Sequence, residues 1–197
     1  MRREAGGASH GATELEDATL RLLLAIGEDP EREGLVHTPR RVAESVRHLT
    51  DGYGTDPTRV VNGALFRYEG DDPVVLRDVP FYSLCEHHLL PFFGRCHMAY
   101  MPAGQVIGLS KLPRLVEVFA HRLQLQERLT RQVAEAIRDA VRPTGVAVVM
   151  EARHLCVEMR GVEKAESDTV TSCLLGDFRR NATLRAEFFE LIRPRAR

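Results

Sequence analysis

The sequence has no excess of charge of either sign. Its 197 residues carry 27 Lys and Arg against 28 Asp and Glu, a formal net charge of −1. Nonspecific binding of nucleic acid requires a strong basic field, and this balance excludes such a field over the whole chain. We therefore expect no nucleic-acid partner, and any site for an anionic ligand must be local.

Long hydrophobic runs are also missing near the N-terminus. The stretch MRREAGGASHGATELED is basic at its start but lacks the apolar core of a secretion signal, and the longest apolar run nearby is LLLAI. We expect a cytoplasmic protein without membrane association. In such a chain the four cysteines, Cys85, Cys96, Cys156 and Cys173, are more typical of free thiols or metal ligands than of a disulfide framework.

Internal repeats and low-complexity blocks are absent too, and an apolar content of 44% allows one sizeable core with an appendage. The polar, Gly- and Ala-rich residues 1–13 predict a flexible tail. Two helices follow: ELEDATLRLLLAIG, and a second in which Thr38 caps and Pro39 takes the first helical position. They predict a helical appendage over residues 14–56 and a main domain over residues 57–197.

The main domain begins with β-type runs, VVNGALFRY, PVVLRDVPFYSL and GRCHMAYMPAG. The long helical stretch SKLPRLVEVFAHRLQLQERLTRQVAEAIRDAV has a polar break at QLQER, which favours two antiparallel helices. The stretch TGVAVVMEARHLCVEMRGV alternates with period two as a strand, and LRAEFFELI forms a closing helix. This order predicts an α+β fold: an antiparallel sheet covered on one face by the two helices, with N-terminal helices added.

One short stretch, LCEHHLLP, concentrates metal-binding chemistry. Cys85 and His88 are three residues apart and converge on one ion if the chain turns there, and Cys156 can arrive from the strand VVMEARHLCVEMRG. Two thiolates and an imidazole suit zinc best among common metals. Residues at period two on that strand are expected to share one face: His154, Cys156, Glu158 and Arg160.

Simpler interpretations remain open for this pattern. Cys85 and Cys156 could be small core side chains with the histidines on the surface, because free cysteine often fills cores. The spacing also leaves open whether three or four protein ligands bind. Four would form a closed structural site, whereas three would leave a position for water and indicate catalysis.

Two further patterns indicate a nucleotide site. In GLSKLPRLVEVF, Ser110 is a candidate N-cap, and Lys111 and Arg114 place two cations in the first helical turn. The dipole at this end of a helix favours anions, so two cations there are unfavourable by themselves. A phosphate chain docked between them and the helix N–H groups would explain them. A solvated basic turn is the alternative. In QLQERL, Gln126 and Glu127 form a donor and acceptor set that can read the edge of guanine, although a surface Glu is a simpler explanation.

Several motifs in one order closely resemble GTP cyclohydrolase I: LCEHHLLPFFG, IGLSKLPRLVEVFA, LQLQERLTRQ, RHLCVEMRGV and TVTSCLLGDF. The resemblance extends from about Thr38 to the C-terminus. It implies a tunnelling fold (T-fold) whose sheets join into a barrel, in a homodecamer of two stacked pentamers with active sites between subunits.

The resemblance also implies residue roles. The zinc ligands match Cys85, His88 and Cys156, which leaves one coordination position for water. The two other histidines of the pocket match His87 and His154. The ribose and triphosphate contacts match Ser110, Lys111, Arg114 and Arg160, with Arg41 added from a neighbouring subunit. The guanine-reading pair matches Gln126 and Glu127. Cys96 and Cys173 lie outside the family pattern.

The implied reaction opens the imidazole ring of GTP, releases C8 as formate and yields 7,8-dihydroneopterin triphosphate, the first step of tetrahydrofolate and pterin biosynthesis. His154 is the candidate to protonate N7, and His87 and Ser110 would assist at the ribose. The H-x-E…P-C-x-x-C pattern of zinc deaminases is absent. The related nitrile reductases lack the zinc set. A zinc-stabilised module without catalysis, or an inactive relative, remains the alternative.

Overall fold

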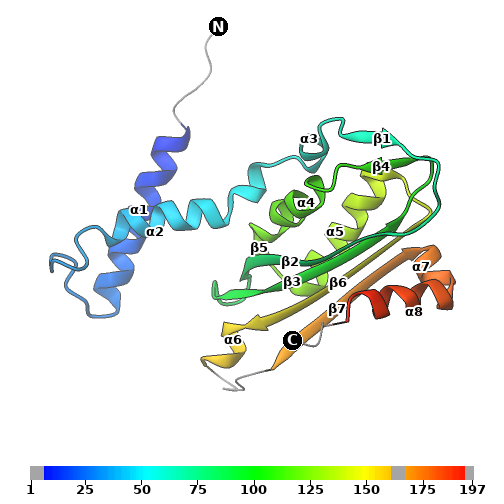
Figure 1. Ribbon diagram of the computed structural model, residues 1–197. Coiled ribbons are helices and arrows are strands. Elements are labelled where there is room, and N and C mark those ends of the chain that lie inside the picture. Colours follow the sequence, from blue (N-terminus) through cyan, green and yellow to red (C-terminus); the bar gives the residue numbers. More distant parts are fainter. Residues whose placement is uncertain (1–6, 161–166, 194–197) are drawn as a thin grey trace, which may run out of the picture. The chain divides into compact units, whose positions relative to one another are not determined.

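The computed structural model describes residues 7–160 and 167–193 (Figure 1). The helices are α1 (Gly7–Ala25), α2 (Thr38–Leu49), α3 (Pro57–Val61), α4 (Lys111–Ala120), α5 (Gln126–Val141), α6 (Leu155–Glu158), α7 (Asp177–Arg180) and α8 (Ala182–Leu191), and a 3-10 turn covers Asp51–Gly54. The strands are β1 (Leu65–Arg67), β2 (Val74–Cys85), β3 (Pro91–Met101), β4 (Gln105–Ile107), β5 (Leu123–Gln124), β6 (Gly145–His154) and β7 (Asp168–Gly176). No described helix is long and apolar enough to cross a membrane.

The chain divides into two compact units, Met1–Thr50 and Asp51–Arg197, so the division precedes the boundary expected after residue 56. In the first unit α1 and α2 pack against each other. Helix α1 already begins at Gly7, within the expected tail; residues 1–6 of that tail lie outside the described residues. The N-cap of α2 is His37 and not Thr38, so Pro39 stands at the second helical position, one residue later than predicted.

The second unit is built on a five-stranded sheet of order β5-β2-β3-β6-β7 (Figure 1). Strands β2, β3, β6 and β7 are antiparallel, as predicted, whereas the two-residue β5 runs parallel to β2. The run VVNGALFRY is only partly a strand. Its first residues end α3, Asn62 and Gly63 turn with positive φ, and β1 pairs with β4 in a separate two-stranded sheet.

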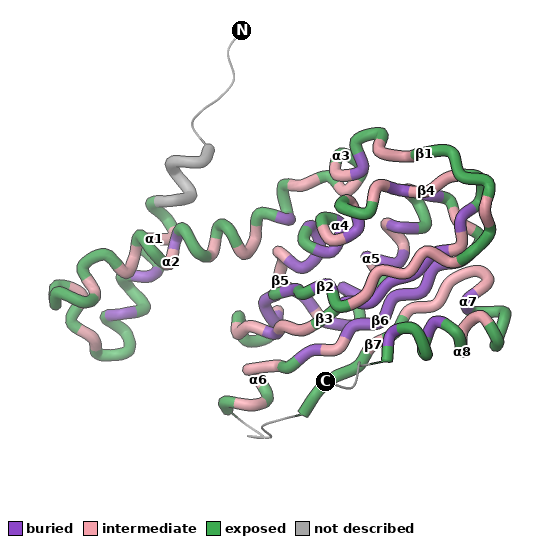
Figure 2. Tube along the Cα trace, viewed as in Figure 1, coloured by how far each residue is buried: buried purple, intermediate pink, exposed green. Residues whose placement is uncertain are grey.

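Helices α4 and α5 cover one face of the sheet, and the main core lies between these helices and the sheet (Figure 2). The predicted apolar stripes are all buried: Leu115, Val116, Phe119, Leu129, Val133, Ile137 and Val141. The side chain of Gln105 in β4, the strand that directly precedes α4, donates to the carbonyl of Val141 at the end of α5. The two helices are therefore antiparallel, as predicted.

The opposite face is partly covered as well, which the sequence did not predict. Ala147 and Val149 of β6 point away from α5 and pack with Phe178 of α7 and Phe188 of α8. This second, smaller cluster accounts for the apolar face of the predicted C-terminal helix. The sheet therefore has a main core on one side and a satellite core at one end of the other side.

A β-bulge in β2 decides which side chains face the main core. Leu76 pairs with Met98, but Val79 pairs with Cys96, so β2 contains one extra residue. An extra residue moves every later side chain to the other face of the sheet. As a result, Cys85 at the end of β2 lies on the face that α4 and α5 cover.

Candidate active site

Three potential metal ligands meet at one end of the sheet. Cys85 ends β2, the chain then turns back so that the N–H of Leu89 donates to the Cys85 carbonyl at 2.8 Å, and Cys156 lies in the first turn of α6. One ligand atom each from Cys85, His88 and Cys156 lies within 4.8 Å of the other two. Among the described residues, the cluster contains only these three side chains.

The geometry of this cluster fits a zinc ion. Sγ of Cys85 and Nδ1 of His88 are 3.8 Å apart, close to the edge of a tetrahedron with zinc–ligand bonds of 2.0–2.3 Å, roughly 3.6 Å. Burial, together with the neighbouring Cys85 thiol, raises the pKa of Cys156 above its ordinary value, so two adjacent thiolates are disfavoured. A divalent cation would remove that penalty.

The strand predicted through Cys156 ends earlier, at His154. Leu155 starts the short helix α6, so the expected single face for His154, Cys156, Glu158 and Arg160 is wrong. The helical turn of α6 places the Cys156 ligand atom within 4.8 Å of those of Cys85 and His88. Glu158 is instead paired with Arg153 of β6 through two hydrogen bonds of 2.9 and 2.6 Å.

His154 is held on two sides at the end of β6. Its ring stacks on Phe92 of β3, with centroids 4.6 Å apart and planes 2° apart, and its Nε2 lies 2.7 Å from Oε1 of Gln126. Burial lowers the pKa of His154 below 6.5, although the nearby charges of Glu127 and Glu158 raise it. The free ring is therefore mostly neutral at pH 7.

Gln126 and Glu127 begin α5 but face different surroundings. The Gln126 side chain is buried, whereas Glu127 is exposed and lines a hollow of about 510 Å³ against β7, together with Arg131, Thr171 and Cys173. The hollow lies at the edge of the sheet, because β7 is its last strand. A carboxylate at an open edge can meet a ligand that a buried amide cannot reach.

An ion pair that sequence analysis missed anchors the turn that carries the candidate ligand His88. Glu86, between two candidate ligands, pairs with Arg128 of α5. Arg128 also donates to the side chain of Gln124 at 3.0 Å and to the carbonyl of Leu123 at 3.1 Å. The spacing of Glu86 and Arg128 along the chain gives no signal of this contact. It ties the turn after β2 to the first turn of α5.

The basic turn lies away from this cluster. Ser110 occupies the N-cap position of α4 without a capping hydrogen bond from its side chain, and Lys111 and Arg114 follow in the first turn. The far end of α4 is the one near the cluster, since Ser83 of β2 donates to the Ala120 carbonyl at 2.7 Å. Ten helical residues span about 15 Å, so one chain does not bring the two groups together.

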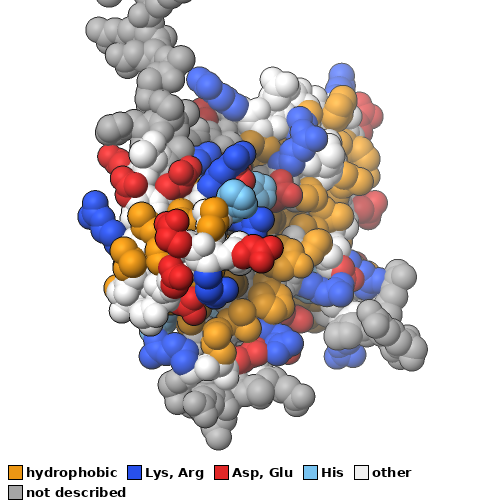
Figure 3. Space-filling view, turned by 90° about the vertical axis from the view of Figure 1, so that its left-hand side faces the viewer, with side chains coloured by type: hydrophobic (Ala, Val, Ile, Leu, Met, Phe, Trp, Pro, Cys, Tyr) orange, Lys and Arg blue, Asp and Glu red, His pale blue; other side chains and the backbone are white. Residues whose placement is uncertain are grey.

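Three remaining candidates lie at the surface. His87 and Arg160 are exposed, and the rings of His87 and His88 lie edge to face with centroids 6.0 Å apart. Arg41 belongs to the first unit, in α2. In the view of Figure 3, histidine side chains reach the surface among acidic and basic ones.

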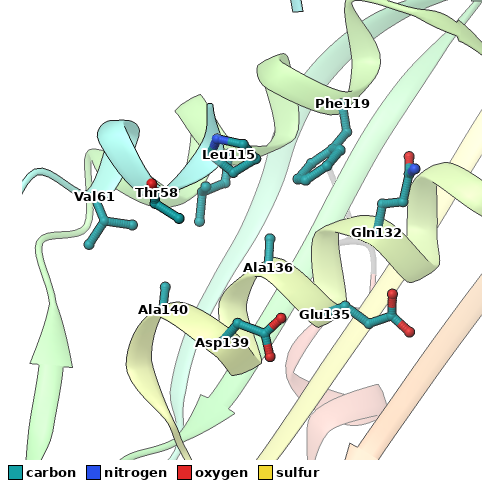
Figure 4. A pocket seen from close by; sticks show the side chains of 10 residues that line it. Thr58, Val61, Leu115, Phe119, Gln132, Glu135, Ala136, Asp139 and Ala140 are labelled. Atoms are coloured by element: carbon teal, nitrogen blue, oxygen red, sulfur yellow. The ribbon is translucent and has the colours of Figure 1, made fainter. Parts of the chain in front are cut away.

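A cavity of about 490 Å³ lies elsewhere, between α3, α4 and α5 (Figure 4). Apolar side chains such as Leu115, Phe119 and Ala136 dominate its lining, and none of the candidate site residues lines it.

Of the two cysteines without a predicted role, Cys96 is buried in the main core, where burial raises its pKa, and Cys173 lines the hollow beside Glu127.

Comparison with known protein sequences points to one family. The sequence model of the family "GTP cyclohydrolase I" matches residues 15–193. The GTP cyclohydrolase 1 of Campylobacter concisus is 55% identical over 177 residues, 90% of this chain and 93% of its own. That of Chlorobaculum tepidum is 54% identical over 178 residues (90% and 80%), and that of Gloeobacter violaceus 51% over 187 residues (95% and 87%).

Among solved structures, the apo form of an archaeosine synthase QueF-like protein aligns with 55% of this chain and 97% of its own, at 18% identity and a TM-score of 0.47.

Proposed function

Because the chain belongs to the GTP cyclohydrolase I family and converts GTP to dihydroneopterin triphosphate, we propose that the reaction takes place beside Cys85, His88 and Cys156. The observation that carries this proposal is the convergence of two thiols and one imidazole on one point. These three side chains would hold zinc, which when bound supplies a Lewis acid that lowers the pKa of water from ~15.7 to about 7.

The chain's own residues would then select and open the guanine. Glu127 accepts from N1–H and N2–H₂ of the base, and His154 gives a proton to N7 as the imidazole ring opens. Loss of C8 releases formate. His87 and Ser110 assist at the ribose. Free thiols suit the reducing cytoplasm, the compartment we propose.

The triphosphate would be bound by cations from more than one chain. Lys111 and Arg114 lie at the far end of α4 from the metal cluster, and together with Arg160 and Arg41 they form the proposed phosphate contacts. A second copy that docks on the open edge of β7 could bring its own α4 to the hollow beside Glu127. We therefore propose the homodecamer of two pentamers, with sheets joined into a barrel and sites between subunits.

Formate release from GTP, measured beside the zinc content of the purified protein, tests this function. We expect near-stoichiometric zinc and one formate per GTP consumed. Zinc without formate release would favour the alternative, a zinc-stabilised module that does not catalyse.

Coexpression of two inactive variants tests the shared site. Lys111→Ala damages the phosphate end and Cys156→Ala the metal end. If subunits mix randomly, about a quarter of interfaces combine two intact ends, so activity returns. Mixed oligomers that stay as inactive as each variant alone would place the whole site within one chain.

A further inference from the structure

The buried amide of Gln126 has only one orientation that satisfies its neighbours. The residue is 2% exposed. Its Nε2 lies 3.0 Å from the carbonyl oxygen of Met150 and 2.9 Å from that of Thr169, and 3.1 Å from Oγ1 of Thr171. A carbonyl oxygen can only accept, so the amide nitrogen must face the two carbonyls, and Oε1 must face His154.

This orientation decides which nitrogen of His154 carries a hydrogen. An amide oxygen can only accept, so His154 Nε2, at 2.7 Å, must donate. A neutral imidazole has one N–H, and the neutral ring is therefore the Nε2–H tautomer with a lone pair on Nδ1. Stacking on Phe92 restricts rotation of the ring, which keeps this arrangement in place.

The same contacts leave the Gln126 side chain with no N–H for a ligand. Its two amide hydrogens have protein acceptors, both of them on strands β6 and β7. A group that reads guanine through its side chain must present an unpaired donor or acceptor at the pocket. Glu127, exposed in the hollow, meets that requirement, and Gln126 does not.

We propose that Gln126 is a positioning residue, which holds His154 as the Nε2–H tautomer and leaves Nδ1 as the atom that exchanges the proton with GTP. This rests on the proposed proton-donor role of His154. Nδ1 first takes a proton from water, which makes the ring an imidazolium. In the transfer this Nδ1–H bond breaks and an N7–H bond forms, so the positive charge passes to the guanine and the ring returns to the neutral Nε2–H tautomer. The Nε2–H bond to Gln126 persists throughout, and the ring does not need to turn.

The tautomer of the native, zinc-loaded enzyme tests the proposal without any variant of Gln126. Solid-state ¹⁵N NMR on enzyme with labelled histidine, at pH 8, distinguishes a protonated Nε2 from a protonated Nδ1. The signal that disappears in His154→Gln identifies the residue. We expect hydrogen on Nε2 of His154. A neutral His154 with hydrogen on Nδ1 would overturn the proposal.

Turnover of Gln126→Met separates positioning from substrate contact. We expect kcat to fall at least about tenfold, with KM for GTP within about twofold and zinc content unchanged, because the acceptor for His154 is lost and the other lost contacts, to Met150, Thr169 and Thr171, are not with substrate. The labelled spectrum should show a mixture of tautomers. A raised KM with unchanged kcat would mean that Gln126 contacts the substrate.

Thr130→Val is the matched control. Its hydroxyl lies in the same buried polar layer, 2.8 Å from the Gln126 carbonyl and 2.7 Å from the Thr171 hydroxyl, without contact to His154. We expect kcat within about twofold of the native value. Equal losses in both variants would reduce Gln126 to a packing role. If His154→Ala kept full formate release, the proton-donor role would fail, while the NMR result would still decide the tautomer.

Discussion

Two histidines on neighbouring strands, His154 on β6 and His97 on β3, show how similar chemistry can serve different ends of one sheet. Burial lowers the pKa of both below 6.5. His154 faces α5 at the metal cluster and donates through Nε2 to a side chain. His97, 3% exposed on the opposite face, accepts through Nδ1 from the backbone N–H of Asp78 at 3.2 Å.

His97 matters to the candidate metal site because it contacts the β-bulge in β2. Asp78 has φ of 60°, an unfavourable value for a residue with a side chain, and its carboxylate is also bound by Arg95 at 3.2 Å. The extra residue in β2 brings Cys85 to the face covered by α4 and α5. His97 thus stabilises the register that brings Cys85 to the candidate site, whereas His154 lies beside that site, two residues before Cys156.

The largest difference between the two regions should follow from removal of the metal donors. Substitution of Cys85, His88 or Cys156 by Ala should remove zinc from a three-ligand site and abolish formate release. His97→Asn should keep its zinc, because Asn can still accept from the Asp78 N–H. Metal analysis by atomic emission on the purified variants measures this. A Cys156→Ala protein with full zinc would contradict the assignment.

A slightly smaller effect is expected from His154→Ala. Loss of a general acid should lower turnover about 10²- to 10⁴-fold while zinc remains near stoichiometric. Formate release and metal content should be measured on the same sample, with His97→Asn as the control that keeps turnover. If His154→Ala were metal-free while His88→Ala kept zinc, His154 would be the metal ligand, and the contrast between His154 and His97 would be wrong.

Glu127→Gln should have an intermediate effect. It replaces a charge-assisted acceptor by an amide that sets a donor against donors of guanine, at a cost of roughly 2–4 kcal/mol in kcat/KM for GTP. Glu135→Gln, two turns further along α5, is the matched control and should change kcat/KM little. Native kinetics in the Glu127 variant would remove this residue from the site.

The smallest effect concerns the pH dependence of stability at His97. Burial lowers its pKa more than Glu151 and Asp78 raise it, and Arg95 and Arg77 lower it further. The unfolded chain then binds a proton that the folded chain does not, so stability is lost as pH falls below 6.5. Urea unfolding at pH 7.5 and 5.5 should show that the free energy of unfolding falls less on acidification in His97→Asn than in the native protein. An unchanged pH dependence would contradict the buried neutral state.

Local sequence patterns predicted much of the fold. Period 3.6 in SKLPRLVEVF and RLTRQVAEAIRDAV identified the buried faces of α4 and α5, because one side of each helix packs against the sheet and the other faces water. Alternation identified most of β6. The spacing of Cys85 and His88 indicated that they converge, and the family motifs indicated Cys156. Each of these inferences needs only neighbouring residues along the chain.

Tertiary structure decided what depends on segments far apart in the chain. The sequence did not reveal the bulge at Asp78, because a register shift shows only when β2 pairs with β3. It did not reveal that β6 stops at His154, since period two continued through Cys156. It did not show that Gln126 is buried or that Glu86 pairs with Arg128. These features arise because hydrogen bonds and ion pairs between distant segments are satisfied together only in the folded chain.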